Sequence, residues 1–190
     1  MGYLLATPIR KFAQDPEKIL SPYIKNGDLA LDVGSAMGFF SLPMARLVGD
    51  SGHVICVDLQ EKMIRGLRNR ARRAGLTNRM EMRVCTPTSL CIDDLGGRVD
   101  FALAFAVVHE VPDAKRFLSE IRAALKQDGI LLFSEPTDHV AREAFNETLS
   151  IARDIGFRAE DTPAIRMSHT ALLTKTWDRR ENQVRRIIQR

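Results

Sequence analysis

Two carboxylates, Asp32 and Asp58, each stand at the end of an apolar stretch and are the residues best placed to do chemistry. Asp32 follows Leu29-Ala30-Leu31 and precedes a loop that contains Gly34 and Gly38. A strand that opens into a glycine-containing loop and then a helix normally binds phosphate through backbone N–H groups. A carboxylate two residues before the first glycine would repel a pyrophosphate. The pattern therefore argues against a dinucleotide.

The same carboxylate favours a ligand that carries positive charge and no phosphate. S-adenosylmethionine has an ammonium group and a positive sulfur, and it fits this requirement. Asp58 closes a second apolar strand about 20 residues beyond the glycine loop, the spacing at which an acidic side chain reaches a ribose diol. An NAD-linked oxidoreductase is the alternative. It is disfavoured by Asp32 and by a G-x-x-x-G spacing in place of G-x-G-x-x-G.

Three segments together resemble the motifs of class I S-adenosylmethionine-dependent methyltransferases of the small-molecule type. They are Asp32-Val33-Gly34-Ser35-Ala36-Met37-Gly38, the strand that ends in Asp58, and Leu125-Lys126-Gln127-Asp128-Gly129-Ile130-Leu131-Leu132. The resemblance implies methyl transfer to a small-molecule acceptor by in-line displacement, with S-adenosylhomocysteine as the product. It also implies that the cofactor is bound by Asp32, Gly34, Ser35, Ala36, Gly38, Asp58, Leu59 and Thr86.

The chain departs from the family pattern at two places. Ala36 replaces the middle glycine of D-x-G-x-G-x-G, and its methyl group narrows the loop and disfavours a positive φ. After the third strand, where the family often has an acidic residue for the adenine amino group, this chain has Cys85-Thr86-Pro87. Thr86, the backbone, or the nearby Asp93 and Asp94 are the candidate replacements. These departures leave a non-catalytic S-adenosylmethionine-binding subunit open as an alternative.

His109 and Glu110 follow the fourth strand, at the edge where an acceptor is expected, and are the catalytic candidates. An imidazole beside a carboxylate can orient a nucleophile or take its proton near neutral pH. The competing interpretation is a structural histidine. Glu110 is the weaker candidate because adjacent strand residues point to opposite faces. Glu135 and His139 reach the same edge, but helix capping and solvent exposure explain them more simply.

The segment Ala104-Phe105-Ala106-Val107 occupies the place of the N-P-P-Y type motif that many methyltransferases acting on amide or base nitrogens carry. Because the segment has no polar residue, it favours an oxygen, carbon or sulfur acceptor. Cys85 and Cys91 share a loop, but without a third thiol nearby a metalloid acceptor is disfavoured. We expect no metal site.

Strands and helices alternate along the chain. The apolar runs predict strands over 29–33, 53–58, 80–84, 100–108 and 130–134, and the pattern between them predicts helices over 39–47, 61–74 and 113–126. A helix before the first strand, a helix over 140–155 and two late strands over 157–161 and 170–176 complete the series. This order predicts an α/β fold with a Rossmann-like doubly wound sheet, mostly parallel, and a C-terminal antiparallel hairpin. Ligands should lie at the carboxyl ends of the strands.

The chain has 190 residues, 45% of them hydrophobic, which suits one domain over 1–190. No apolar run could span a membrane, the start lacks the features of a signal peptide, and three cysteines fit reduced thiols, so we expect a cytoplasmic protein. No long insertion between the predicted elements could form a lid over the expected ligand site. Residues 1–14, the loop after Asp161, or a second copy in a homodimer are the candidate lids, and 178–190 form a basic tail.

The net charge is +4, and arginines gather in two stretches, around residues 65–73 and 179–190. In the first stretch Met63, Ile64, Leu67 and Ala71 repeat at helical spacing, which leaves the arginines for the solvent face. An RNA or protein methyltransferase is the alternative function. Its nucleic-acid form rests on charge alone, because no interleaved aromatic residues offer a stacking platform.

Overall fold

A seven-stranded mixed sheet forms the centre of the protein. The computed structural model describes residues 15–160 and 163–176. The strand order is β3-β2-β1-β4-β5-β7-β6. The strands are β1 (Leu29–Val33), β2 (His53–Asp58), β3 (Met80–Val84), β4 (Val99–Phe105), β5 (Leu125–Pro136), β6 (Phe157–Ala159) and β7 (Ser168–Lys175).

The strand directions confirm the predicted Rossmann-like doubly wound sheet. β1 pairs in parallel with β2 on one side and with β4 on the other, so Asp32 lies between Cys56 and Leu103. β2–β3 and β4–β5 are also parallel, whereas β7 runs antiparallel to both β5 and β6. The chain switches sides of the sheet between β1 and β4, and this is where a ligand crevice opens in such folds.

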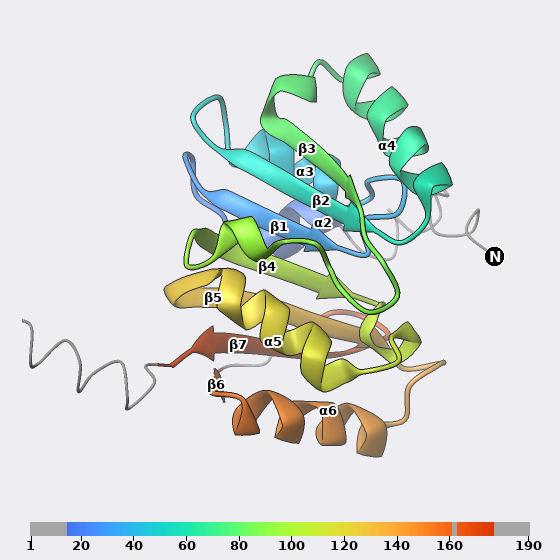
Figure 1. Cartoon of the computed structure of the whole chain (residues 1–190), viewed down its shortest axis with the longest axis vertical. Helices are drawn as coiled ribbons and strands as arrows, with labels where there is room; N and C mark the ends of the chain where they lie inside the picture. Colours follow the sequence, from blue (N-terminus) through green and yellow to red (C-terminus); the bar gives the residue numbers. More distant parts are fainter. Residues whose placement is uncertain (1–14, 161–162, 177–190) are drawn as a thin grey trace, which may run out of the picture.

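Helices cover both faces of the sheet. They are α2 (Pro16–Leu20), α3 (Ser41–Leu47), α4 (Glu61–Arg73), α5 (Ala114–Ala124) and α6 (Arg142–Asp154), with short 3₁₀ turns η2 (Thr77–Arg79), η3 (Asp93–Leu95) and η4 (Val108–Glu110). One apolar core joins the sheet to α5 and α6, and a second joins it to α2, α3 and α4. Figure 1 shows α5 in front of β5, with α2 and α3 behind the sheet.

The sequence-based boundaries of β1, β2 and β3 agree with the structure, but the predicted strand 100–108 ends early. β4 stops at Phe105 because Ala106 adopts a φ of 56°, in the left-handed region, while its N–H donates to the Ser134 carbonyl at 2.8 Å. His109 and Glu110 therefore lie on η4 and not on a strand. The prediction that His109 and Glu110, as adjacent strand residues, point to opposite faces of the sheet was wrong for this reason.

Three predicted features lie outside the described residues: the N-terminal segment 1–14, the basic tail 178–190, and part of the loop that begins at Asp161. Within the part of the chain that the structure describes, the helices are too short and too polar to cross a membrane.

Candidate cofactor and acceptor sites

Asp32 is a buried carboxylate at the carboxyl edge of the sheet. Its side chain is 3% exposed, and the Ser41 hydroxyl donates to its Oδ2 at 2.5 Å. Burial raises the pKa of Asp32 from its ordinary 3.8 to about 7, the Ser41 hydrogen bond lowers it, and the negative charge of Asp58 raises it further. A positively charged group placed beside Asp32 would reverse the effect of burial.

Asp58 fixes the turn of the glycine loop. Its Oδ2 accepts the N–H of Ala36 at 2.8 Å, and its Oδ1 accepts the N–H of Gln60 at 2.8 Å. A carboxylate has about four acceptor positions, so both oxygens can still accept a hydroxyl. Asp58 is therefore held in place and can also bind a diol.

The loop between β1 and α3 carries three residues in the left-handed region: Gly34 (φ 77°), Ala36 (φ 45°) and Gly38 (φ 85°). A Cβ at Gly34 would lie 2.8 Å from a methyl of Val107, and one at Gly38 would collide with Leu67. Both glycines are thus required by close packing. Ala36 adopts the conformation that its methyl disfavours.

The residues of this loop fit the cofactor that the sequence predicts. The Ser35 hydroxyl is buried and makes no hydrogen bond, although the Ser35 N–H donates to the Val57 carbonyl at 3.0 Å. A buried polar group without a partner is costly in the absence of a ligand. Asp32, Ser35 and Asp58 thus place two carboxylates and one hydroxyl without a partner at the carboxyl ends of β1 and β2.

On the side of the site expected for adenine, Thr86 is engaged with Ser89. The Thr86 hydroxyl accepts the Ser89 N–H at 3.0 Å and donates to the Ser89 carbonyl at 3.3 Å, so it closes its own turn. Asp94 pairs with Arg83. Leu59, directly after Asp58, is an exposed apolar side chain, 52% exposed, suited to contact a flat base.

Cys85 lies on the same side, half-buried and close to Asp58. Its burial, and next the charge of Asp58, raise the pKa of its thiol to about 11. At neutral pH this thiol therefore stays protonated and is a poor nucleophile.

The structure joins His109 to Glu135, although the sequence predicts Glu135 as a helix cap or surface residue. The His109 Nδ1 lies 2.5 Å from Oε2 of Glu135, and the N–H groups of Val108 and His109 donate to Oε1 at 2.8 and 3.2 Å. Glu135 is 2% exposed. Burial raises its pKa, and the hydrogen bond and charge of His109 lower it.

Glu110 and two further histidines lie near this pair. The His109 Nε2 is 4.0 Å from the carboxylate of Glu110, which is largely exposed, and the His139 ring stacks on His109 at 6.4 Å between ring centroids. His169 is opposite Glu135 in the β5–β7 register, and its buried Nδ1 has no hydrogen-bond partner. No signal in the sequence connects Glu135 to His109, since 26 residues separate them.

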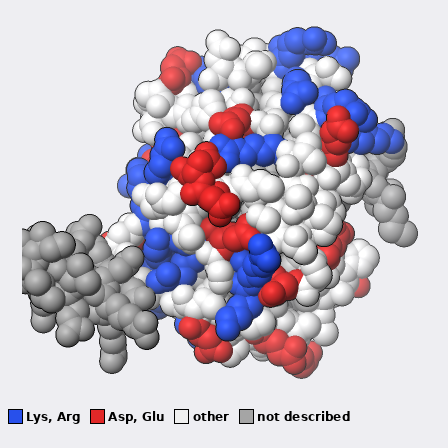
Figure 2. Space-filling view, viewed as in Figure 1, with Lys and Arg blue, Asp and Glu red and all other residues white. Residues whose placement is uncertain are grey.

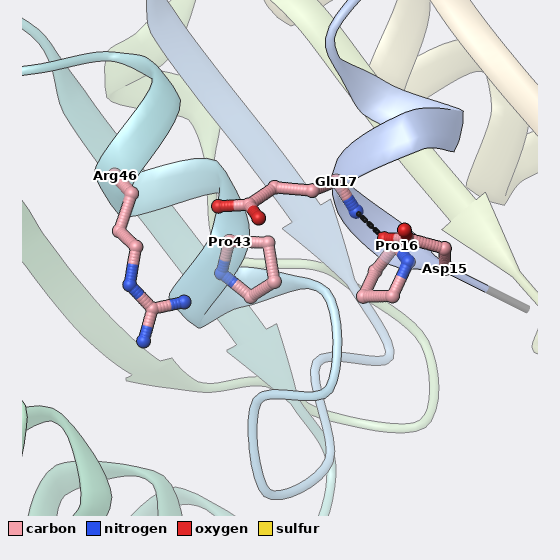
Figure 3. A pocket seen from close by; sticks show the side chains of 5 residues that line it. All are labelled: Asp15, Pro16, Glu17, Pro43 and Arg46. Carbon is pink, nitrogen blue, oxygen red and sulfur yellow. Dashed lines mark hydrogen bonds between the residues drawn. The ribbon is translucent and has the colours of Figure 1, made fainter. Parts of the chain in front are cut away.

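Among the described residues, no group of three or more histidines, cysteines or acidic residues is placed to hold a metal ion. A surface hollow lies between α2 and α3, lined by Asp15, Pro16, Glu17, Pro43 and Arg46 (Figure 3). None of these five belongs to the predicted cofactor or acceptor residues. In Figure 3 Asp15 is engaged in capping α2, where it accepts the Glu17 N–H at 3.1 Å.

Comparison with known proteins agrees with this geometry. A family model described as "Methyltransferase domain" matches residues 24–185. The chain belongs to this family, the class I S-adenosylmethionine-dependent methyltransferases, and its cofactor is S-adenosylmethionine.

Particular relatives differ in the acceptor. The chain is 31% identical over 122 residues to a demethylmenaquinone methyltransferase of Lactobacillus johnsonii, a match that covers 63% of this chain and 49% of that protein. It is 46% identical over 55 residues to a 23S rRNA (uracil(1939)-C(5))-methyltransferase of Psychrobacter arcticus, covering 29% of this chain and 11% of that protein. The chain thus spans at most about half the length of these two curated relatives.

Among solved structures, a SAM-dependent methyltransferase from Aquifex aeolicus superposes with a TM-score of 0.81 at 25% identity. The match covers 91% of this chain and 96% of that one.

Proposed function

We propose that this protein transfers the methyl group of S-adenosylmethionine to a small-molecule acceptor that loses a proton to His109 during the reaction. The observation that carries the proposal is the contact of 2.5 Å between the His109 Nδ1 and Glu135. S-adenosylmethionine supplies an activated methyl group, so the protein has to position the acceptor and receive its proton.

Glu135 determines which nitrogen of His109 is available. Two backbone N–H groups hold the carboxylate, so it accepts a proton-bearing Nδ1 and leaves the lone pair on Nε2. The His109 side chain is 27% exposed, so Nε2 can be reached from solvent. The tautomer is assigned from this hydrogen bond.

The reaction that follows balances without any further reagent. The acceptor oxygen or carbon forms a bond to the methyl carbon, the S–C bond breaks with its electron pair going to sulfur, and the acceptor proton passes to the His109 Nε2. We expect a hydroxyl acceptor, or a ring carbon activated by one, because such groups become strong nucleophiles when the proton leaves. The quinone-pathway name of the Lactobacillus johnsonii relative supports this class.

On the cofactor side, we propose that Asp32 faces the ammonium group, directly or through water, and that Asp58 binds the ribose hydroxyls. Leu59 contacts the adenine, and the loop from Gly34 to Gly38 surrounds the methionine part. Because its hydroxyl proton and its N–H both bond to Ser89, Thr86 would contribute only as an acceptor, through its carbonyl oxygen or its hydroxyl oxygen.

The test uses a panel of phenols and quinols with radiolabelled S-adenosylmethionine. His109→Asn should lower kcat by roughly 10²- to 10⁴-fold while leaving S-adenosylhomocysteine affinity unchanged. Glu135→Gln replaces one of the two accepting oxygens by an NH2 group, so it cannot accept from Nδ1 and from the two backbone N–H groups at once, and it should lower kcat as well. His139→Asn is the matched control, because that ring stacks on His109 without touching Glu135 in any hydrogen bond.

The panel also distinguishes a proton acceptor from a structural histidine. The loss caused by His109→Asn should shrink as the phenol becomes more acidic, because an acceptor that is already ionised needs no base. An equal loss for all acceptors would reject His109 as the proton acceptor. Transfer to RNA, with none to any small acceptor, would reject the small-molecule assignment.

A further inference from the structure

Helix α4 packs against the glycine loop with one edge of its surface. The loop residue Gly38 leaves room for the Leu67 side chain, since a Cβ at position 38 would collide with it. One residue earlier on α4, Gly66 leaves room for Met37. A Cβ at position 66 would lie 3.1 Å from Cγ and 3.2 Å from Sδ of Met37. The loop and the helix thus pack closely at two glycines, Gly38 of the loop and Gly66 of α4.

Arg70 adds a charged hydrogen bond to this contact. Its Nη1 donates to the backbone carbonyl of Met37 at 2.6 Å across 33 residues of sequence. Arg70 is partly buried, whereas Arg68 and Arg72 on the same helix are exposed, and their side chains make no hydrogen bond with the described residues. Hydrogen bonds with an ionised donor are about twice as strong as neutral ones.

The bond connects α4 to the loop at the peptide between Met37 and Gly38. The N–H groups of Gly34 and Ser35 donate to Val57, and that of Ala36 donates to Asp58. The Met37 N–H makes no hydrogen bond with the described residues. In the next peptide, the Gly38 N–H donates to the Ser35 carbonyl at 2.9 Å, and the Met37 carbonyl accepts from Arg70, which ties this turn to α4. Ala36, the residue just before it, occupies a strained φ of 45°.

We propose that Arg70 is a positioning residue for S-adenosylmethionine, which holds the Met37 peptide so that the glycine loop is already in shape for the amino acid end of the cofactor. The inference rests on the proposed role of this loop in binding the methionine part. Arg70 acts through the loop backbone. A preformed loop reduces the ordering that binding would otherwise require.

The experiment compares two ligands by calorimetry. S-adenosylhomocysteine has the amino acid end, and 5′-methylthioadenosine lacks it. Arg70→Gln should weaken S-adenosylhomocysteine binding by about tenfold, as expected for loss of a charged hydrogen bond, and should change 5′-methylthioadenosine binding less than about twofold. Arg70→Lys should recover part of the affinity. Arg72 is an exposed arginine two positions further along, on the last turn of α4, and Arg72→Gln should bind both ligands as the wild type does.

Each outcome decides a separate question. Wild-type protein that binds neither ligand overturns the proposed function. Wild-type binding with an unchanged Arg70→Gln, or with equal loss of both ligands, overturns only the role of Arg70. If Arg70→Gln does not fold, Gly66→Ala tests the same contact from its other side, because its methyl group would displace Met37. Selective loss of S-adenosylhomocysteine affinity is again expected. Equal loss of affinity for both ligands overturns the inference.

Discussion

At the scale of single residues, burial makes ionisation of Asp32 costly in free energy, and a bound cofactor with a positive charge would remove that cost. The folded protein holds this carboxyl group with a pKa of about 7 against an ordinary 3.8, mainly because burial disfavours its charge. The folded state therefore binds the proton more tightly than the unfolded state does. The protonated Asp32 carboxyl therefore adds to the free energy of unfolding at low pH. This stabilising contribution is lost as the pH rises from about 4 to about 7.

Asp32→Asn should therefore stabilise the protein without cofactor at pH 8, by on the order of 1–3 kcal/mol, and have little effect at pH 4. The Ser41 hydroxyl can still donate to the amide oxygen, so the loop keeps its support. The same variant should bind S-adenosylmethionine far more weakly, since the ammonium group loses its counter-charge. Urea unfolding at the two pH values and calorimetric titration measure both effects. A variant that is less stable at pH 8 would contradict the assigned burial cost.

At the scale of elements, the sequence predicts the bounds of those strands that form continuous apolar runs. β1 and β2 were predicted with their observed ends because the first run stops at Gly34 and the second at the carboxylate Asp58, and β3 was predicted with its observed end just before Cys85-Thr86-Pro87. The end of β4 was not, because Ala106 belongs to an apolar run and its left-handed φ has no local signal. The partner of His109 could not be predicted either, since the contact with Glu135 forms only when β4 and β5 lie side by side.

Arg70 is a different case, because the sequence does contain a signal for it. It stands three residues after Leu67 and seven after Met63, next to the apolar stripe of α4. The helical spacing of the apolar residues predicted a solvent-exposed position for every arginine in this stretch, and for Arg70, which is partly buried, that prediction was wrong. Its position on the helix would have placed it at the edge of the buried face.

The glycine loop yields a prediction at this scale. Gly38→Ala should destabilise the protein by roughly 2–4 kcal/mol, because the new methyl group meets Leu67 and the residue must keep a φ of 85°. Ala36→Gly should change stability by no more than about 1 kcal/mol in either direction, since relief of strain offsets the greater freedom of glycine in the unfolded state. Chemical unfolding of both variants measures the difference.

A double-mutant cycle shows whether Leu67 is the cause. In a Leu67→Ala background the cost of Gly38→Ala should fall by about 1 kcal/mol or more, because the side chain that blocks the methyl group is gone. Additive effects of the two substitutions would mean that backbone strain at position 38, and not the contact with α4, is the reason for glycine there.

At the scale of the whole molecule, charge is distributed unevenly. Figure 2 shows basic side chains gathered over α4, while acidic and basic side chains alternate across the middle of the same face. The exposed arginines of α4 are Arg65, Arg68, Arg72 and Arg73, of which Arg65 pairs with Glu61 at 2.9 Å. Three lie in the second half of the helix, where positive charge is favoured by the helix dipole. This placement explains the cluster without a nucleic-acid partner.

The RNA alternative can be tested against this explanation by its dependence on salt. If the arginines serve only as exposed charges at the C-terminal half of α4, a structured RNA should bind weakly at about 50 mM salt and lose that binding by about 200 mM. Non-specific binding weakens with salt because it depends on the release of counterions from the RNA. Replacing Arg68, Arg72 and Arg73 by Gln should then leave S-adenosylhomocysteine binding and turnover of any small acceptor unchanged. Fluorescence anisotropy with labelled RNA measures the first effect. Sub-micromolar RNA binding near 150 mM salt that disappears in the triple variant would instead make α4 an RNA contact surface, and the rRNA methyltransferase relative would become the better guide to the acceptor.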